Sequence, residues 1–184
     1  FAFVYRDFST GNVFLARDRH GEKPLYYSVQ NGRLFFASEI KAILRHPEFY
    51  NVDIDIQSID QYLTFDYIPG SKTLYDGIKK VLPGELVIFN NKDIIKKFYY
   101  YRPIADVDDA KINNGLSNNE IVDLLQDKIE VSVRDRLVAD VPIGVFLSGG
   151  LDSSLIAAIA GKLSPGIEAF TVKFDGSSYD ESKE

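Results

Sequence analysis

A short loop rich in glycine and serine is the part of this sequence whose residue types and spacing could do chemistry. It reads Ser148-Gly149-Gly150-Leu151-Asp152-Ser153-Ser154. An apolar run precedes it and helical periodicity follows it, so backbone N–H groups and the positive end of a helix would face one small volume. Such a volume suits a phosphate or pyrophosphate group. The two glycines allow the backbone to approach the phosphate oxygens, and the three serines can add hydroxyl donors.

The acidic residue of this loop points to a metal ion. Asp152 beside a polyphosphate makes sense mainly as a ligand of the accompanying Mg²⁺, which prefers oxygen ligands. The loop is not a Walker A motif, because that motif needs a lysine and none lies between Lys128 and Lys162. The plainer alternative is a tight turn at the glycines, followed by a helix with Ser153 as its cap. The position of the whole loop between an apolar run and a helical pattern favours phosphate binding.

The elements that would position the loop follow the order strand, helix, strand. An apolar run at 141–147, with Pro142 confined to its start, predicts the first strand. Apolar residues at helical spacing over 155–163 predict the helix, and the apolar run at 168–174 predicts the second strand. We expect the two strands to be parallel and joined by a right-handed crossover. The sequence therefore predicts a βαβ unit.

A longer helix is expected before this unit. Ser117 and Glu120 have the spacing of a capping box, in which each side chain satisfies a backbone N–H group of the other. Apolar residues then recur at helical spacing to about Ala139. This pattern predicts a helix over 117–139.

The first hundred residues are typical of antiparallel sheets. Three hairpins are predicted. The first joins strands at 1–5 and 13–18, and the second joins strands at 25–29 and 34–37 around Asn31-Gly32. The third joins strands at 86–89 and 94–101 around Asn90-Asn91. Helical patches at 38–44 and 58–65 would begin with Ser38 and Ser58 as their caps.

Other charged and aromatic features have plain interpretations from residue type. Arg17 and Asp18 are expected at a solvated hairpin end, as a local ion pair that contributes little stability. His20 and His46 are expected at the surface or in turns. The aromatic run 98–101 is more typical of packing between domains than of base stacking.

Composition divides the chain into two parts. Residues 1–101 carry 13 basic and 12 acidic side chains and 20 of the 24 aromatic ones, whereas residues 102–184 carry 8 basic, 15 acidic and 4 aromatic ones. The polar segment 102–118, with its acidic cluster at Asp106, Asp108 and Asp109, predicts a solvated linker. We therefore expect domains at 1–101 and 119–184.

Composition also excludes several classes of function. A net charge of -6 argues against a general nucleic-acid-binding protein. The absence of cysteine excludes disulfides, thiolate zinc sites and a cysteine nucleophile, and two histidines are too few for a histidine-built metal site. The sequence shows neither a signal peptide nor an apolar run long enough to cross a membrane, so we expect a cytoplasmic location and no membrane partner. Because methionine is also absent, we expect the chain to be a piece of a longer protein.

The loop and its flanks resemble the asparagine synthetase B family of glutamine-hydrolysing, ATP-dependent amidotransferases. The segment 140–154, from Asp140-Val141-Pro142 to the two final serines, closely resembles the pyrophosphate-loop signature of that family. Upstream segments resemble the second half of its glutaminase domain, namely Phe1-Ala2-Phe3, residues 16–27, residues 36–42 and Leu82-Pro83-Gly84. The two blocks occur in the same order in the family.

This resemblance implies a fold class for each part of the chain. The first part would be the second half of an α+β, antiparallel glutaminase domain of the N-terminal nucleophile type. The second part would be the start of an α/β pyrophosphate-loop ATP-binding domain with a parallel sheet. The family's glutaminase uses a cysteine as first residue, which would lie outside this chain. No residue here, Phe1 included, is therefore assigned to glutamine hydrolysis.

The resemblance also implies a reaction and its site. With ATP and Mg²⁺, aspartate would become β-aspartyl-AMP with loss of pyrophosphate, and ammonia from glutamine would convert it to asparagine. Residues 148–154 would cradle the pyrophosphate, Asp152 would bind Mg²⁺, and Leu147 and Val172 would contact the adenosine part. Lys173 stands where the family usually has glycine. This departure argues against a close approach of the backbone to the ligand at this position. The implied partners are ATP, aspartate and glutamine, and a homodimer is compatible with the family.

Two alternatives stay open at this point. Relatives of the family amidate cell-surface sugar acids or close β-lactam rings, and the loop does not distinguish them because it contacts phosphate rather than the acceptor carboxylate. The chain could also belong to a noncatalytic nucleotide-binding module.

Overall fold

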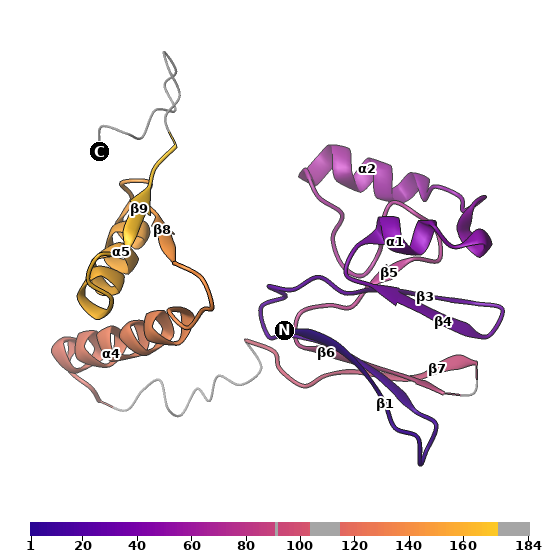
Figure 1. Ribbon diagram of the computed structural model, residues 1–184, viewed down its shortest axis with the longest axis horizontal. Helices are drawn as coiled ribbons and strands as arrows, with labels where there is room; N and C mark the ends of the chain where they lie inside the picture. The colour runs from indigo at the N-terminus through magenta and orange to yellow at the C-terminus, as the bar shows by residue number, and fades with distance from the viewer. Residues whose placement is uncertain (91, 104–114, 173–184) are drawn as a thin grey trace. The chain divides into compact units, whose positions relative to one another are not determined.

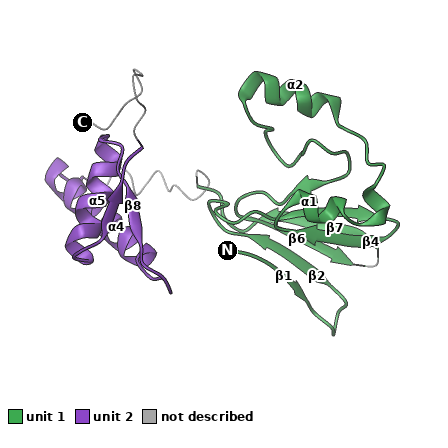
Figure 2. Cartoon of the chain, turned by 45° about the horizontal axis from the view of Figure 1, so that its top comes forward, with its two compact units in different colours: residues 1–108 green, residues 109–184 purple. Residues whose placement is uncertain are grey.

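The computed structural model describes residues 1–90, 92–103 and 115–172 (Figure 1). The chain separates into two compact units, residues 1–108 and 109–184 (Figure 2). Each unit is described by itself. The predicted linker at 102–118 lies mostly outside the described residues, so its boundaries stay a prediction.

The first unit contains two antiparallel sheets, because its sequence alternates apolar and polar residues in short runs joined by turns. One sheet has the strand order β1-β2-β6-β7 and the other has the order β4-β3-β5. Their strands are β1 (Ala2–Arg6), β2 (Val13–Arg17), β3 (Tyr26–Gln30), β4 (Arg33–Ala37), β5 (Lys79–Lys80), β6 (Glu85–Asn90) and β7 (Asp93–Tyr99). All three predicted hairpins are confirmed, at β1–β2, β3–β4 and β6–β7.

The turn between β3 and β4 shows why this hairpin forms locally. Asn31 and Gly32 have φ values of 52° and 71°, which are the left-handed conformations that a two-residue hairpin turn requires. Glycine adopts such a conformation without steric cost and asparagine tolerates it better than most residues. The β6–β7 hairpin differs by a register irregularity between Ile88 and Phe89.

The two sheets share a buried apolar core. It consists of Leu15 and Val87 from the first sheet, Tyr27 from the second, and Leu25 and Val81 from the connections. Leu15 pairs with Val4 on one side and with Val87 on the other, so one face of the first sheet supplies these side chains. The unit is therefore a sandwich of antiparallel sheets.

Helix α1 (Ile40–Leu44) and the short 3-10 helix η1 (Pro47–Phe49) pack on the other face of the β3–β4–β5 sheet. Helix α2 (Ile56–Phe65) lies farther from that sheet, and most of its large apolar side chains are exposed (Figure 1). Ile43, Phe49 and Ile78 form a second buried cluster, against which Tyr26 and Phe35 pack from the sheet.

The two helix caps predicted for this unit are wrong. Helix α2 begins two residues earlier than predicted, because the carboxylate of Asp55 accepts the N–H of Gln57 at 3.0 Å and is its cap. Ser58 is fully buried and donates its hydroxyl to Asp55 at 3.1 Å. Helix α1 has Glu39 rather than Ser38 at its start, with no side-chain cap.

Arg17 and Asp18 are also placed differently from the prediction. Asp18 is buried, and its carboxylate accepts the backbone N–H groups of His20, Glu22 and Lys23 at 3.0 Å each. The Arg17 guanidinium donates instead to the carbonyl oxygens of three residues, Gly21, Lys23 and Val81. Both side chains thus order the connection between β2 and β3, because they satisfy backbone groups there.

The second unit contains helix α4 (Asn118–Arg136), strand β8 (Gly144–Phe146), helix α5 (Leu151–Leu163) and strand β9 (Glu168–Phe170). The strands pair in parallel, with Val145 opposite Ala169, so the predicted βαβ unit is confirmed. Within the part of the chain that the structure describes, three residues of each strand make ladder pairs, so both are shorter there than predicted; residues 173–174 of the predicted second strand lie outside it.

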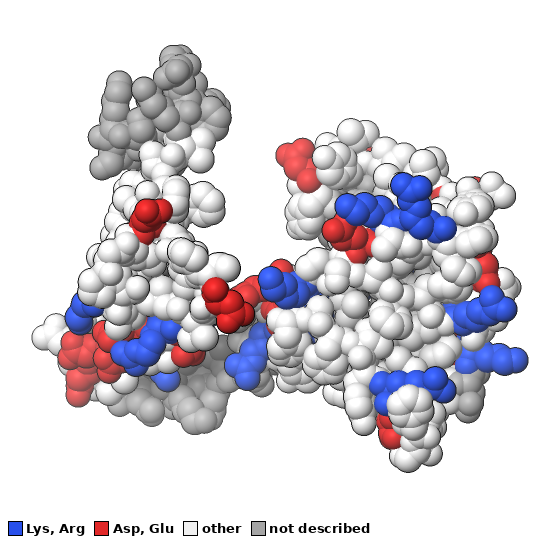
Figure 3. Space-filling model, in the orientation of Figure 1, with Lys and Arg blue, Asp and Glu red and all other residues white. Residues whose placement is uncertain are grey.

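Helix α4 begins with the predicted capping box. The Ser117 hydroxyl accepts the Glu120 N–H, and the Glu120 carboxylate accepts the Ser117 N–H at 2.8 Å. The helix ends at Arg136, three residues before the predicted end. Figure 3 shows acidic and basic side chains side by side over α4, where Glu130 pairs with Arg134 at 2.8 Å.

Candidate functional site

The glycine-serine loop lies at the carboxyl end of a parallel strand. It leaves β8 after Phe146 and enters α5 at Leu151, and β9 lies beside β8. Ligands of parallel α/β sheets bind at this edge, where loops and helix starts gather. The predicted phosphate-binding residues 148–154 are therefore together at one edge of the βαβ unit.

The backbone of the loop depends on its two glycines in different ways. Gly149 has a φ of 78°, a left-handed conformation that other L-residues adopt only at a cost. Gly150 is the N-cap of α5 with φ −70° and ψ 160°, which any residue can adopt, and it offers no side chain to cap the helix. A Cβ atom at Gly150 would lie 3.6 Å from the Ser148 Oγ, an ordinary contact. Its lack of a side chain is therefore not required by the fold.

The start of α5 presents unpaired backbone donors. The first bond of the helix runs from the Ser154 N–H to the Gly150 carbonyl at 3.0 Å. The N–H groups of Leu151, Asp152 and Ser153 precede this bond and have no intrahelical acceptor. Together with the helix dipole, these donors form an environment that attracts an anion.

Ser153 is not the helix cap that the plainer alternative expects. It lies within α5, and its Oγ accepts the Ser148 N–H at 3.3 Å and donates to the Gly150 carbonyl at 3.0 Å. The Ser148 Oγ lies 3.0 Å from it. The fold thus brings together two serines five positions apart, which no spacing rule for caps or turns predicts.

Asp152 and Ser154 are exposed in the first turn of α5. A carboxylate in this position is favoured by the helix dipole without any metal. Within residues 1–90, 92–103 and 115–172, no group of three or more His, Cys, Asp or Glu side chains is arranged to hold a metal ion. A Mg²⁺ ion at Asp152 would take its other ligands from water and phosphate oxygens, as this ion commonly does beside nucleotides.

Leu147 and Val172 lie just beyond the last paired residues of the two strands. The Leu147 N–H donates to the Phe170 carbonyl at 2.8 Å, and the Thr171 hydroxyl donates to the Leu147 carbonyl. Val172 follows directly and is exposed. The two predicted adenosine contacts thus lie at the same edge as the loop, whereas Lys173 lies outside the described residues. The contribution of Thr171 was not predicted, although it directly precedes Val172.

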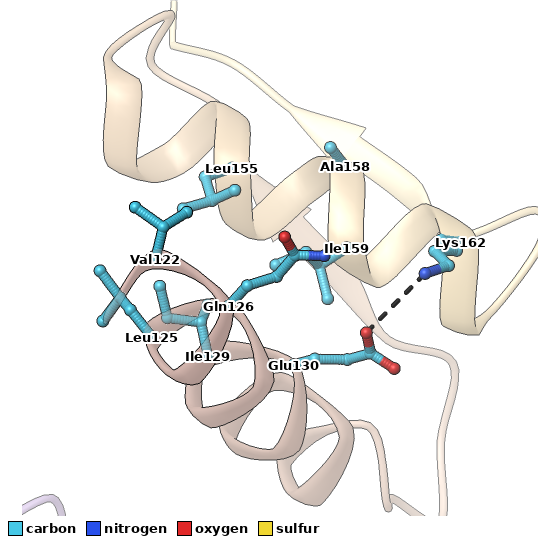
Figure 4. A pocket seen from close by; sticks show the side chains of 9 residues that line it. All are labelled: Val122, Leu125, Gln126, Ile129, Glu130, Leu155, Ala158, Ile159 and Lys162. Atoms are coloured by element: carbon cyan, nitrogen blue, oxygen red, sulfur yellow. Dashed lines mark ion pairs between the residues drawn. The ribbon is translucent and has the colours of Figure 1, made fainter. Parts of the chain in front are cut away.

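A separate groove of about 420 Å³ lies between α4 and α5 (Figure 4). Its walls are mainly apolar, with Val122, Leu125 and Ile129 on α4 facing Leu155 and Ile159 on α5. One end carries an ion pair of 3.8 Å between Glu130 and Lys162. None of residues 147–154 lines this groove, so it is separate from the glycine-serine loop.

Comparison with known proteins decides the family. A family model described as a glutamine amidotransferase domain matches residues 1–100, and one described as asparagine synthase matches residues 124–184. The chain belongs to the glutamine amidotransferase domain family. Its resemblance to the asparagine synthetase B family is confirmed, because the two models match in the order that the motifs predict.

Relatives of this glutamine amidotransferase chain match it from end to end. It is 34% identical over 98% of its length to an asparagine synthetase [glutamine-hydrolyzing] 1 of Bacillus subtilis, and covers 27% of that protein. It is 33% identical over 98% of its length to a putative asparagine synthetase [glutamine-hydrolyzing] 2 of Methanocaldococcus jannaschii, covering 35%. An amidase chry2 of Gibberella zeae is 33% identical over 99% of the chain, which covers 28% of it. The chain thus spans about a quarter to a third of these relatives.

No helix among the described residues is both long enough and apolar enough to cross a membrane.

Proposed function

We propose that this chain is part of an ATP-dependent amidotransferase that converts aspartate to asparagine with ammonia from glutamine. The observation that carries the proposal is the order of its parts. A glutamine amidotransferase domain precedes a segment matched by the asparagine synthase model, and that segment contains the loop 148–154 between β8 and α5. The enzyme would be a carbon–nitrogen ligase acting on small molecules in the cytoplasm.

The two units would belong to two domains with different activities, glutamine hydrolysis and ATP-dependent activation of aspartate. The antiparallel sandwich of the first unit supports assignment to the second half of a glutaminase domain of the N-terminal nucleophile type. The parallel β8–α5–β9 unit supports assignment to the start of a pyrophosphate-loop ATP-binding domain. We place these domains at 1–101 and 119–184, with a linker at 102–118.

The donor set of the loop fits the polyphosphate of ATP. Backbone N–H groups at the start of α5 and the exposed Ser154 hydroxyl are donors, and phosphate oxygens are acceptors only. The glycines keep side chains away from the approach to these donors. Leu147 and Val172 would contact the adenosine part at the ends of the two strands. The loop would therefore orient the α-phosphate toward the acceptor carboxylate.

Asp152 is the residue that would hold Mg²⁺ beside this polyphosphate. When bound, the ion neutralises charge on the leaving pyrophosphate. The backbone donors of the loop do the same, because they are already oriented where negative charge develops. The first chemical step would form β-aspartyl-AMP and release pyrophosphate, and ammonia would then displace AMP from the acyl carbon to give asparagine.

Glutamine hydrolysis requires a group that this chain lacks. A terminal thiolate with its own α-amino group as base is the nucleophile of the implied mechanism, and no cysteine occurs among the 184 residues. We therefore expect no glutamate release by the 184-residue chain alone.

The test is aspartate-dependent pyrophosphate release by the full-length protein. Gly150→Val would place a branched side chain in the phosphate approach, and Asp152→Asn would remove the carboxylate charge. Both variants should lower the rate of pyrophosphate release by more than they weaken AMP binding. Gly161→Ala, in the same helix but outside the loop, is the matched control and should retain the wild-type rate.

Two results would contradict the proposal in different ways. Equal rates of pyrophosphate release in wild type, Gly150→Val and Asp152→Asn would remove the loop from the ATP site. Pyrophosphate release that depends on another carboxylate, and not on aspartate, would favour a related amidotransferase. The amidase among the relatives makes this second comparison necessary.

A further inference from the structure

The hydroxyl of Ser153 is the centre of a hydrogen-bond cluster inside the loop. It contacts the Ser148 N–H at 3.3 Å, the Ser148 Oγ at 3.0 Å and the Gly150 carbonyl at 3.0 Å. These contacts connect the end of the strand with the first turn of the helix. They span the two glycines, which are the most flexible residues of the loop.

The directions of these bonds follow from the donors available. A carbonyl oxygen only accepts, so Ser153 must donate its single hydroxyl proton to Gly150. Ser153 is then the acceptor toward both the N–H and the hydroxyl of Ser148. Its hydrogen-bonding capacity is used entirely within the loop.

A phosphate oxygen needs a donor, and Ser153 has none left for it. Other groups than the Ser153 hydroxyl are therefore the donors that remain without an acceptor in the loop. They are the N–H groups at the start of α5 and the hydroxyl of Ser154, which is exposed and hydrogen-bonds to no residue that the structure describes. Of the three serines expected to add hydroxyl donors, Ser154 is therefore the one whose hydroxyl this geometry leaves available to phosphate.

We propose that Ser153 is a positioning residue, whose hydroxyl holds Ser148 and the Gly150 carbonyl in place so that the backbone donors of the loop are preorganised for pyrophosphate. The identity of the ligand rests on the function proposed above. A loop with two adjacent glycines loses much conformational freedom when it binds a ligand. A hydrogen-bonded link between residues 148 and 153 removes part of that cost before binding.

The first experiment needs no ligand. Hydrogen exchange in the full-length protein is followed by mass spectrometry on a peptide that covers the Ser148 amide. In Ser153→Ala the Ser148 N–H loses its acceptor, so its exchange should become about fivefold faster, the effect of losing one ordinary hydrogen bond. Ser153→Thr keeps the hydroxyl and should retain slow exchange. Ser164→Ala, at the other end of α5, is the control and should also exchange as wild type does.

The second experiment measures the affinity for Mg²⁺-pyrophosphate by calorimetry. Ser153→Ala should lower the affinity for pyrophosphate about fivefold and leave the affinity for AMP unchanged. Ser153→Thr, which keeps the hydroxyl, should bind pyrophosphate as the wild type does. A double-mutant cycle with Ser148→Ala separates positioning from direct contact. If Ser153 acts through Ser148, the double variant should bind pyrophosphate about as well as the weaker single variant. Melting temperatures close to that of Ser164→Ala show that the variants fold.

The outcomes are distinguishable. Unchanged exchange of the Ser148 amide in Ser153→Ala would overturn the positioning role. Additive losses of pyrophosphate affinity in Ser148→Ala and Ser153→Ala would overturn it as well, since two independent ligands of phosphate would behave in this way. Faster exchange in Ser153→Ala, with no binding of pyrophosphate by the wild type, would support the positioning role and refute the proposed function.

Discussion

Gly144 lies directly against the ring of Phe170, at the point where β8 and β9 pair. A Cβ atom at position 144 would overlap the Cε2 of Phe170 and lie 3.2 Å from the Glu168 carbonyl oxygen. The ring must therefore move if any side chain is added at this position. The ring of the second strand thus occupies the space beside position 144 of the first strand.

We therefore predict that Gly144→Ala destabilises the second unit. Overpacking a buried core costs about 1–3 kcal/mol in free energy of unfolding, but the Phe170 ring is half exposed and can turn away, so the cost here should be about 1 kcal/mol. Gly161→Ala is the matched control, because no described atom outside its own stretch of helix backbone lies within 4 Å of its Cβ position, and alanine favours a helix over glycine by about 1 kcal/mol. Urea unfolding of both variants measures the difference. A Gly144→Ala variant at least as stable as Gly161→Ala would contradict the close packing.

The two loop glycines should respond differently to alanine. Gly149→Ala forces an L-residue into a left-handed conformation and should cost about 1–2 kcal/mol in free energy of unfolding. Gly150→Ala has ordinary backbone angles, so the free energy of unfolding should change by no more than about 0.5 kcal/mol. Its Cβ should nevertheless weaken pyrophosphate binding. Urea unfolding and calorimetry on both variants test this separation, and equal losses of stability would refute it.

Asp18 should make the first unit sensitive to acid. Burial by itself would raise the pKa of this carboxyl, but the N–H groups of Lys23 and Glu22, the α-ammonium group of Phe1 at 3.2 Å and the N–H of His20 outweigh it and hold the pKa well below its usual range. Because the folded-state pKa lies below the unfolded value of about 4, the carboxylate stabilises the fold fully above that value. Its contribution is lost as the pH falls through the folded-state pKa.

The measurement is the free energy of unfolding from pH 7 down to about pH 2. Tyrosine fluorescence reports on the first unit, because 10 of the 11 tyrosines lie in residues 1–101. Asp18→Asn should cost about 1–3 kcal/mol at pH 7, and its stability should fall less steeply in acid than that of wild type. Asp60→Asn, an exposed carboxylate on α2, should behave as wild type does. Parallel acid profiles of wild type and Asp18→Asn would contradict the role of this carboxylate.

Limited proteolysis should cut first between residues 102 and 119. The segment is polar, has little apolar periodicity and joins two compact units. Proteases cut such exposed polar segments first. Mass spectrometry of the early fragments identifies the sites. First cuts within 141–163, with protection of 102–119, would contradict the two-domain division.

Local sequence determined much of this protein. The capping box of Ser117 and Glu120, the turn at Asn31-Gly32 and the order strand, loop, helix, strand around residues 148–154 are all predicted correctly. Each depends on residues within a few positions of one another, where steric preferences and short hydrogen bonds decide the conformation.

Tertiary structure decided the features that depend on distant residues. Asp18 is buried because the backbone of residues 20–23 folds over its carboxylate, a contact that residue type does not reveal. Strand length at β8 and β9 depends on which residues find a ladder partner, and the closeness of Gly144 to Phe170 depends on that pairing. The link between Ser148 and Ser153 likewise exists only because a left-handed glycine turns the chain back onto the first turn of α5. Such contacts form between surfaces that only the folded chain brings together, and no periodicity of the sequence encodes them.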